Sequence, residues 1–221
     1  MKKDLIIWGA TGQCIVLEEF LSLNYNIIAL FDKNKSIASP FTNVPIYNDE
    51  AKFLNFIQQK KNLHFIVAIG GEFGKIRIEV SNKLEDLGLK VINAIHPEAN
   101  IANNVITGKG VQILISATIA TRANIGDYCI VNSSASIDHE CNIKEGVHIA
   151  PGATLAGCVI VGENSFVGSG AIILPRLKIG ANSIIGAGAV VTKDIPPYSV
   201  AIGNPAKVTR TLEPINIDGT W

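Results

Sequence analysis

The stretch from Ile125 to Val161 reads IGDYCIVNSSASIDHECNIKEGVHIAPGATLAGCVIV and carries an aliphatic residue at every sixth position. The same spacing continues in both directions without a break. A short fixed period of this kind is typical of a solenoid, in which each repeat contacts only its neighbours. The aliphatic positions are Ile113, Ile119, Ile125, Val131, Ile137, Ile143, Ile149, Leu155, Val161, Val167, Ile173, Ile179, Ile185 and Val191.

A smaller residue follows most of these aliphatics at a distance of four, as at Ala117, Ala135 and Ala153, with Leu177 as the exception. Two residues then lead to the next aliphatic, which is the alternation of a strand with both side chains facing inward. The interval of four residues, from each aliphatic to the next small residue, must contain a corner, because a flat strand cannot span it with both side chains facing inward. Three six-residue sides make a coil of 18 residues, so the pattern predicts a triangular parallel β-helix. The alternative is a structural-only or ice-binding β-helix, which should show a ladder of Thr or polar residues on one face, and none recurs.

The first third of the chain alternates between two patterns. Apolar runs predict strands, and amphipathic segments between them predict helices. This alternation indicates a small parallel sheet covered by helices. The expected strands are Asp4–Trp8, Asn26–Phe31, Phe65–Ile69 and Lys90–Ile95, and the expected helices are Ile15–Leu23, Asp49–Lys60 and Lys75–Leu87. We expect domains at 1–96 and 97–210 and a tail at 211–221.

The overall composition favours a cytoplasmic globular protein. Nineteen basic and nineteen acidic residues balance, which gives no net charge to attract nucleic acid or an anionic membrane. Apolar residues make up 48% of the chain, yet no run is long enough to cross a bilayer. The four cysteines contain no CxxC pair, and we expect neither disulfides nor a metal site.

The segment GAGAVVTKDIPPYSVAIGNPAK, residues 186–207, resembles the closing segment of the hexapeptide-repeat acyltransferases. That superfamily forms left-handed parallel β-helices. An αβ unit followed by such a β-helix resembles one subfamily: the bacillosamine- and perosamine-type N-acetyltransferases of nucleotide-linked amino sugars, and the related sialic-acid O-acetyltransferases.

The resemblance implies transfer of an acetyl group from acetyl-CoA to the amine of a nucleotide-activated 4-amino-4,6-dideoxy sugar. A UDP-linked sugar is favoured, with GDP or dTDP as alternatives, in the synthesis of a surface glycan or glycoprotein sugar. It also implies a homotrimer that binds acetyl-CoA between adjacent prisms. The alternative is O-acetylation of a sialic-acid-type sugar, which could use the same base.

The candidate catalytic residues lie at one predicted corner. His139 follows the inward Ile137 by two residues, so it can project outward, and Glu140 stands beside it. The stretch 132–141, NSSASIDHEC, matches the family's catalytic segment, in which the histidine deprotonates the acceptor and the acid raises its basicity. Gly157 lies 157 − 139 = 18 residues, or one coil, after His139. Its N–H suits the oxygen of the thioester.

The remaining site residues follow from the resemblance. It implies that His148 contacts acetyl-CoA and substrate, and that Ser169 and Ala187 contact CoA through their backbones. Gly9-Ala-Thr-Gly12 precedes a predicted helix, whose N-terminus can bind phosphate. In the resemblance Thr11, Gly12 and Gln13 match the pyrophosphate loop, Asp32 and Lys33 match a pair that recognises the base, and Gly70 matches a backbone contact near the base. Gln13 stands where the family often has His, and Lys33 where it often has a second acid.

Other functions are disfavoured by particular residues. A dinucleotide fingerprint needs glycine where Ile7 stands. A γ-type carbonic anhydrase needs three zinc-binding histidines, and only His139 and His148 lie in the β-helix. A purely regulatory nucleotide-binding protein would not need the His139–Glu140 pair. Cys14 and Cys158 have no histidine nearby in sequence, so a thiol nucleophile is not expected.

Overall fold

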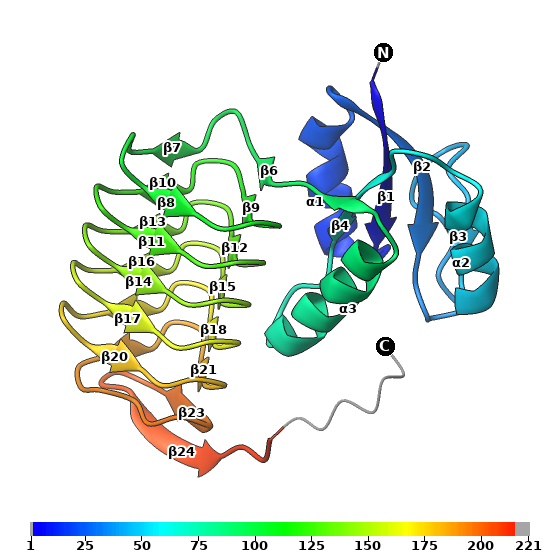
Figure 1. The fold of residues 1–221 in the computed structure, drawn as a ribbon. Helices are drawn as coiled ribbons and strands as arrows, with labels where there is room; N and C mark the ends of the chain where they lie inside the picture. Colours follow the sequence, from blue (N-terminus) through cyan, green and yellow to red (C-terminus); the bar gives the residue numbers. More distant parts are fainter. Residues whose placement is uncertain (1, 215–221) are drawn as a thin grey trace. The chain divides into compact units, whose positions relative to one another are not determined.

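A computed structural model describes residues 2–214, which form two compact units (Figure 1). We call them the αβ unit, residues 2–69 and 76–94, and the β-helix unit, residues 70–75 and 95–214. The boundary expected between residues 96 and 97 differs from this division mainly at residues 70–75, which cluster with the β-helix unit.

The αβ unit is built on a parallel sheet of five strands in the order β3-β2-β1-β4-β5. Strand β1 is central because β2 pairs with one of its edges and β4 with the other. The strands are β1 (Lys3–Trp8), β2 (Tyr25–Phe31), β3 (Ile46–Tyr47), β4 (His64–Val67) and β5 (Lys90–Val91), and the helices are α1 (Gly12–Leu21), α2 (Glu50–Gln58) and α3 (Gly74–Asp86).

An aromatic cluster joins α2 to the sheet. The Phe53 ring of α2 lies 5.1 Å from Phe31, 5.7 Å from Trp8 and 5.6 Å from Tyr47, measured between ring centroids. Phe31 and Phe53 are fully buried. Rings at these separations add specific packing to the burial of apolar area, and they fix α2 on this part of the sheet.

The expected elements are present, with shifted ends. Helix α1 begins at Gly12 rather than Ile15, and Asp49 forms the N-cap of α2 by accepting a hydrogen bond from the Lys52 N–H at 3.0 Å. Strand β3 was not expected, because two residues carry too little pattern. The strand expected at 90–95 is two strands, and the second, β6 (Ala94–Ile95), pairs with the β-helix.

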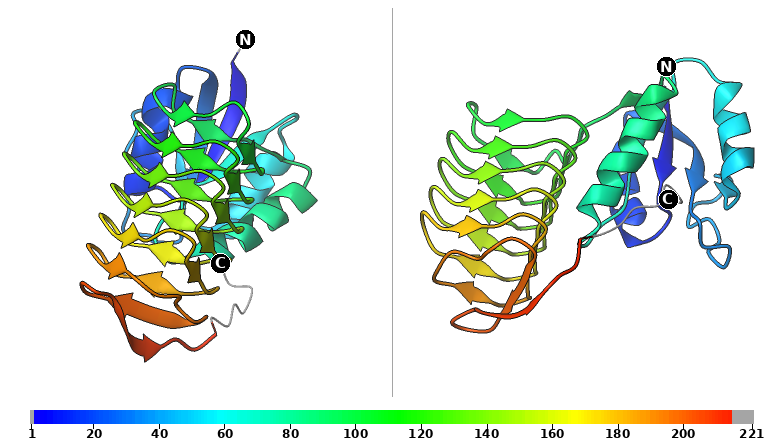
Figure 2. Two further views of the ribbon diagram at one scale, coloured as in Figure 1. Left: turned by 90° about the vertical axis from the view of Figure 1, so that its left-hand side faces the viewer. Right: turned by 60° about the horizontal axis from the view of Figure 1, so that its bottom comes forward.

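The β-helix has three faces, each a stack of short strands (Figures 1 and 2). Face 1 holds β7 (Asn100–Ile101), β10 (Thr118–Ile119), β13 (Ser136–Ile137), β16 (Thr154–Leu155), β19 (Ile172–Ile173) and β22 (Val190–Val191). Face 2 holds β8 (Ile106–Thr107), β11 (Asn124–Ile125), β14 (Asn142–Ile143), β17 (Ile160–Val161) and β20 (Lys178–Ile179). Face 3 holds β6, β9 (Gln112–Ile113), β12 (Ile130–Val131), β15 (His148–Ile149), β18 (Phe166–Val167), β21 (Ile184–Ile185), β23 (Ser199–Ile202) and β24 (Lys207–Thr211). The strands are two residues long and parallel, except for the longer β23 and β24 at the end of face 3.

The six-residue register is confirmed. All the aliphatic positions from Ile113 to Val191 are at most 1% exposed, and the small residues such as Ala117 and Ala135 are fully buried beside them. Each aliphatic from Ile113 to Ile185 is followed three positions later by a corner residue with positive φ, as at Ser134 (57°), Glu140 (58°) and Cys158 (62°). This left-handed residue turns the chain, and pairing partners lie 18 residues apart, for example Ile137 and Leu155.

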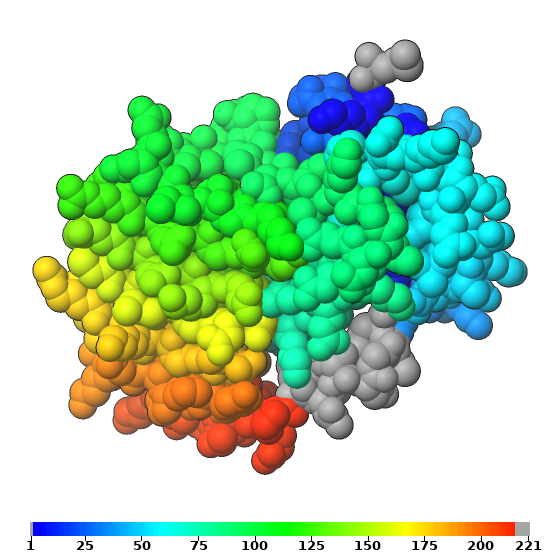
Figure 3. Space-filling view, in the orientation of Figure 1, coloured from blue at the N-terminus to red at the C-terminus, as the bar shows by residue number. Residues whose placement is uncertain are grey.

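The chain closes the β-helix with an antiparallel pair, β23 and β24. Thr211 lies in β24 and pairs with Ser199, so the tail expected from residue 211 starts inside this strand. Residues 212–214 follow the strand, and the rest of that expected tail, from 215 to 221, lies outside the described residues. In the space-filling view the coils form successive colour bands from green to orange (Figure 3). Within residues 2–214, none of the helices has the length and apolar character that crossing a membrane requires.

Candidate active site at a corner of the β-helix

His139 and Glu140 occupy the corner between β13 and β14. The His139 Nδ1 atom lies 3.2 Å from Glu140 Oε2, and the two side chains are 45% and 49% exposed. A carboxylate can only accept a hydrogen bond, so Nδ1 carries the hydrogen and Nε2 keeps a free electron pair. The Glu140 N–H donates to the Thr121 carbonyl at 3.0 Å, which holds the corner against the preceding coil. The pair therefore holds a basic nitrogen, Nε2, at this corner, on the side of the ring that faces Gly157.

Gly157 lies directly against the His139 ring, one coil further on. A Cβ built at residue 157 would overlap the imidazole, lying 2.6 Å from its Cε1 atom. Gly157 itself is buried, and within residues 2–214 its N–H has no hydrogen-bond partner. The stacking expected from the 18-residue spacing is present, and a free N–H donor lies beside the imidazole.

His148 points outward from the β-helix core, as its sequence position predicted, but it is buried rather than exposed. It lies on β15 of face 3 and is only 5% exposed. Its Nδ1 accepts a hydrogen bond from the Gly71 N–H at 2.8 Å, its Nε2 lies 3.1 Å from Asn132 Nδ2, and its ring packs edge-on against Phe166. It is therefore held by the segment that contains Gly70, rather than standing free on the surface.

The loop before α1 is open to solvent. Thr11 is the N-cap residue of α1, and its side chain makes no capping hydrogen bond. A Cβ built on Gly12 would point into open space, with no contact within 4 Å. Thr11 and Gly12 are exposed and Gln13 is half-buried. The first-turn N–H groups and the helix dipole favour an anion here.

Asp32 supports this loop. Its Oδ2 accepts from the Ala10 N–H at 3.0 Å and its Oδ1 from the Asn34 N–H at 2.9 Å. Asn48 donates from Nδ2 to the backbone oxygens of Asp32 and Asn34. Both carboxylate oxygens thus already bind backbone, which gives Asp32 a positioning role in addition to the expected contact with a base. Lys33 beside it is exposed.

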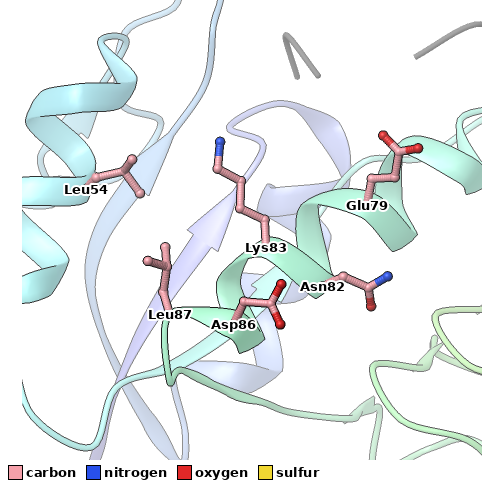
Figure 4. Close-up of a pocket in the computed structure, with 6 residues that line it drawn as sticks. All are labelled: Leu54, Glu79, Asn82, Lys83, Asp86 and Leu87. Carbon is pink, nitrogen blue, oxygen red and sulfur yellow. The ribbon is translucent and has the colours of Figure 1, made fainter. Parts of the chain in front are cut away.

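The expected CoA contacts, Ser169 and Ala187, form an exposed column on adjacent coils. The Gly188 N–H donates to the Ser169 carbonyl at 2.8 Å and so links these coils. A hollow between α2 and α3 contains none of the expected site residues (Figure 4). It is lined by Leu54, Glu79, Asn82, Lys83, Asp86 and Leu87, of which Lys83 pairs with Glu50.

The expected residues thus fall into four groups. His139, Glu140 and Gly157 meet at one corner, and Gly70 is next to the Gly71 that binds His148. Thr11, Gly12, Gln13 and Asp32 surround the loop of the αβ unit, and Ser169 and Ala187 form the fourth group.

Three residues outside the expected set lie beside the expected site residues. Cys158 and Arg122 approach Glu140, and Asn132 approaches His148. Arg122, Glu140 and Cys158 are spaced 18 residues apart, one coil each, and this spacing could have predicted that Arg122 and Cys158 lie beside Glu140.

Comparisons with known proteins agree with this architecture. The model of the family "Bacterial transferase hexapeptide (six repeats)" matches residues 140–175 and 158–193. The model "PglD N-terminal domain" matches residues 4–84. The fold and corner site therefore define a hexapeptide-repeat β-helix protein with a PglD-type αβ unit.

Similar solved structures show which group of hexapeptide-repeat proteins the chain resembles. A point mutant of perosamine N-acetyltransferase from Caulobacter crescentus, in complex with CoA and GDP-perosamine, is 34% identical to this chain and superimposes with a TM-score of 0.86. The match covers 94% of this chain and 97% of that one. The acetyltransferase domain of PglB from Neisseria gonorrhoeae, in complex with acetyl coenzyme A, is 30% identical over 94% of this chain and 100% of its own, with a TM-score of 0.83. The chain belongs to the hexapeptide-repeat family of sugar N-acetyltransferases.

A curated relative, GDP-perosamine N-acetyltransferase from Escherichia coli O157:H7, is 38% identical over 98 residues. The aligned part spans 44% of this chain and 43% of that relative, which is less than half of either protein.

Proposed function

We propose that this protein transfers an acetyl group from acetyl-CoA to the amine of a GDP-linked 4-amino sugar of the perosamine type. The observation that carries the proposal is the His139–Glu140 pair stacked on Gly157. Family membership supports the reaction class. The preference for UDP that the sequence suggested lacks support, since the relatives named above include enzymes of GDP-perosamine.

The first chemical requirement is a neutral amine. A sugar ammonium has no electron pair with which to attack the thioester carbon, so a proton must leave. His139 Nε2 has the free pair to accept it, because Glu140 fixes the hydrogen on Nδ1 at 3.2 Å. General-base help of this kind contributes about 10²–10⁴-fold.

The second requirement is stabilisation of the negative charge on the thioester oxygen. The unpartnered Gly157 N–H beside the imidazole can donate to it. When the C–S bond breaks, the departing CoA thiolate takes up a proton, and the products are the N-acetyl sugar and CoA. His139 can return to the thiolate the proton that it accepted, and the second proton, which the nitrogen loses from the tetrahedral intermediate, is released to water, so the step balances.

The αβ unit supplies the diphosphate-binding loop in this proposal. Thr11, Gly12 and Gln13 would bind the diphosphate at the start of α1, and Gly70 would lie near the base. Ser169, Ala187 and the buried His148 would contact CoA. We further propose a homotrimer, and a role in surface-glycan synthesis in the cytoplasm.

The test measures CoA release by chromatography with GDP-, UDP- and dTDP-linked 4-amino-4,6-dideoxy sugars. We expect turnover with the GDP sugar and a loss of about 10²–10⁴-fold in kcat for His139→Asn. Full activity of His139→Asn would refute the assignment of the base. Activity only with a sialic-acid-type hydroxyl acceptor would instead establish O-acetylation.

A further inference from the structure

The corner carries a third reactive side chain that acetyl transfer does not need. Cys158 is one coil after Glu140, and both residues occupy the left-handed corner position, with φ of 62° and 58°. The Cys158 N–H donates to the His139 carbonyl at 2.9 Å, so the two coils are tied together here. Cys158 Sγ lies 3.9 Å from Glu140 Oε2, the same oxygen that lies 3.2 Å from His139 Nδ1.

We propose that His139, Glu140 and Cys158 form an inhibitory binding site for Zn²⁺. The imidazole nitrogen, carboxylate oxygen and sulfur all lie within 4.8 Å of one another, the one such group found in residues 2–214. Zinc binds these three donor types tetrahedrally at roughly 2.0–2.3 Å, which places neighbouring donors about 3.5 Å apart. The observed 3.2 and 3.9 Å separations bracket that value, and a water would take the fourth position.

The surroundings allow an ion to enter without breaking other contacts of Glu140. Its Oε2 faces the cluster, whereas Oε1 lies 3.7 Å from Arg122 Nη1. The His139 and Glu140 side chains are about half exposed, and Cys158 is partly exposed. The other cysteines, Cys14, Cys129 and Cys141, are buried, so a solvent ion meets Cys158 first.

Bound zinc would remove the base. The ion needs the electron pair of His139 Nδ1, which displaces the hydrogen that Glu140 now holds there. In a neutral imidazole that hydrogen must then be on Nε2, the nitrogen that should accept the proton of the amine. This consequence rests on the proposed function, whereas binding of the ion does not.

The binding test uses the full chain, without substrates, and Co²⁺ as a spectroscopic probe for Zn²⁺. We expect one equivalent of Co²⁺ to give a thiolate-to-cobalt charge-transfer band that Zn²⁺ abolishes. Cys158→Ser and Cys158→Ala should lack the band. Glu145→Gln, which removes an exposed carboxylate outside the cluster, should keep it. No band in the unmodified protein, or the same band in Cys158→Ser, would overturn the site.

The second test measures initial rates of CoA release in zinc-buffered solution, because released CoA itself binds zinc. We expect saturating Zn²⁺ to slow the reaction about tenfold or more, with recovery on adding a chelator. Cys158→Ser should have the normal basal rate and need about tenfold more Zn²⁺. Equal zinc sensitivity of both proteins would refute inhibition through this cluster. A protein with no acetyl transfer would refute the proposed function, and the cobalt band would still decide the metal site.

Discussion

At the scale of single residues, the two histidines of the β-helix are held in opposite tautomers. A carboxylate faces Nδ1 of His139, so this nitrogen carries the hydrogen. The Gly71 N–H faces Nδ1 of His148, so that nitrogen carries none. His139 is 45% exposed and His148 is 5% exposed. The environment, rather than the residue type, therefore separates a basic, accessible imidazole from a buried one that positions a loop.

Gly157 gives a direct steric test of the corner. We expect Gly157→Ala to lower kcat on the order of 10²-fold, because the new Cβ would displace the His139 ring from its place. The control is Gly152→Ala, where a built Cβ has no atom within 4 Å, although φ is +67°. Steady-state rates and circular dichroism of both variants provide the measurement. If Gly157→Ala were as active as Gly152→Ala, the contact with His139 would have no catalytic importance.

The cysteines should differ in reactivity. Burial, with a contribution from Glu18 and Asp32, raises the pKa of the Cys14 thiol to about 12, and burial raises that of Cys141 to about 11. Because the thiolate is the reactive form, both should stay inert in the folded protein even at about pH 9. A disulfide reagent should label Cys158 alone until the protein unfolds, as peptide mass spectrometry can show. Labelling of Cys14 in the folded state would contradict this.

At the scale of elements, a ladder of serines occupies the small inward position in the last coils of the β-helix, in the column where earlier coils have Cys129 and Val147. The fully buried Ser183 donates from Oγ to the Pro196 carbonyl at 2.9 Å and accepts from the Ser199 N–H at 3.1 Å. Ser165 Oγ bonds in the same way to the Gly180 carbonyl and the Ser183 N–H. These hydroxyls satisfy backbone groups at the end of the stack, where the chain leaves the six-residue period.

We expect Ser183→Ala to destabilise the protein by about 1–3 kcal/mol, since it leaves the Pro196 carbonyl and the Ser199 N–H unsatisfied. Alanine fits this inward register elsewhere, as at Ala171, so steric effects should be small. The midpoint of urea unfolding provides the measurement, with the exposed Ser116→Ala as the control. Equal midpoints for the two variants would mean that the ladder does not stabilise the fold.

The sequence predicted the β-helix better than it predicted the site. Each inward position obeys one local rule, so the period from Ile113 to Val191 fixed both burial and the stacking of Gly157 on His139. The burial of His148 depends on Gly71, which is 77 residues away, and no local pattern encodes that contact. Strand β3 and the ends of α1 and α3 were missed or shifted because short elements depend on caps and neighbours rather than on periodicity.

At the scale of the whole molecule, the β-helix unit exposes aliphatic side chains close to the candidate active site. Ile172 on face 1 is 42% exposed and Leu174 is 40% exposed. Leu174 lies one coil after Ala156, the neighbour of Gly157. Apolar groups of this size beside a polar catalytic corner favour coverage by another copy of the chain, in keeping with the proposed homotrimer.

We therefore expect sedimentation equilibrium to give about three times the chain mass, and Ile172→Lys to shift the protein towards monomers. Acetyl transfer should fall in parallel, because His139 and Glu140 are about half exposed in the isolated chain and need a second wall to exclude water around the thioester. Leu23→Lys, at an exposed leucine of the αβ unit, should leave both assembly and rate unchanged. A fully active monomer would show that one chain contains the complete site, and the exposed Ile172 would then need another explanation.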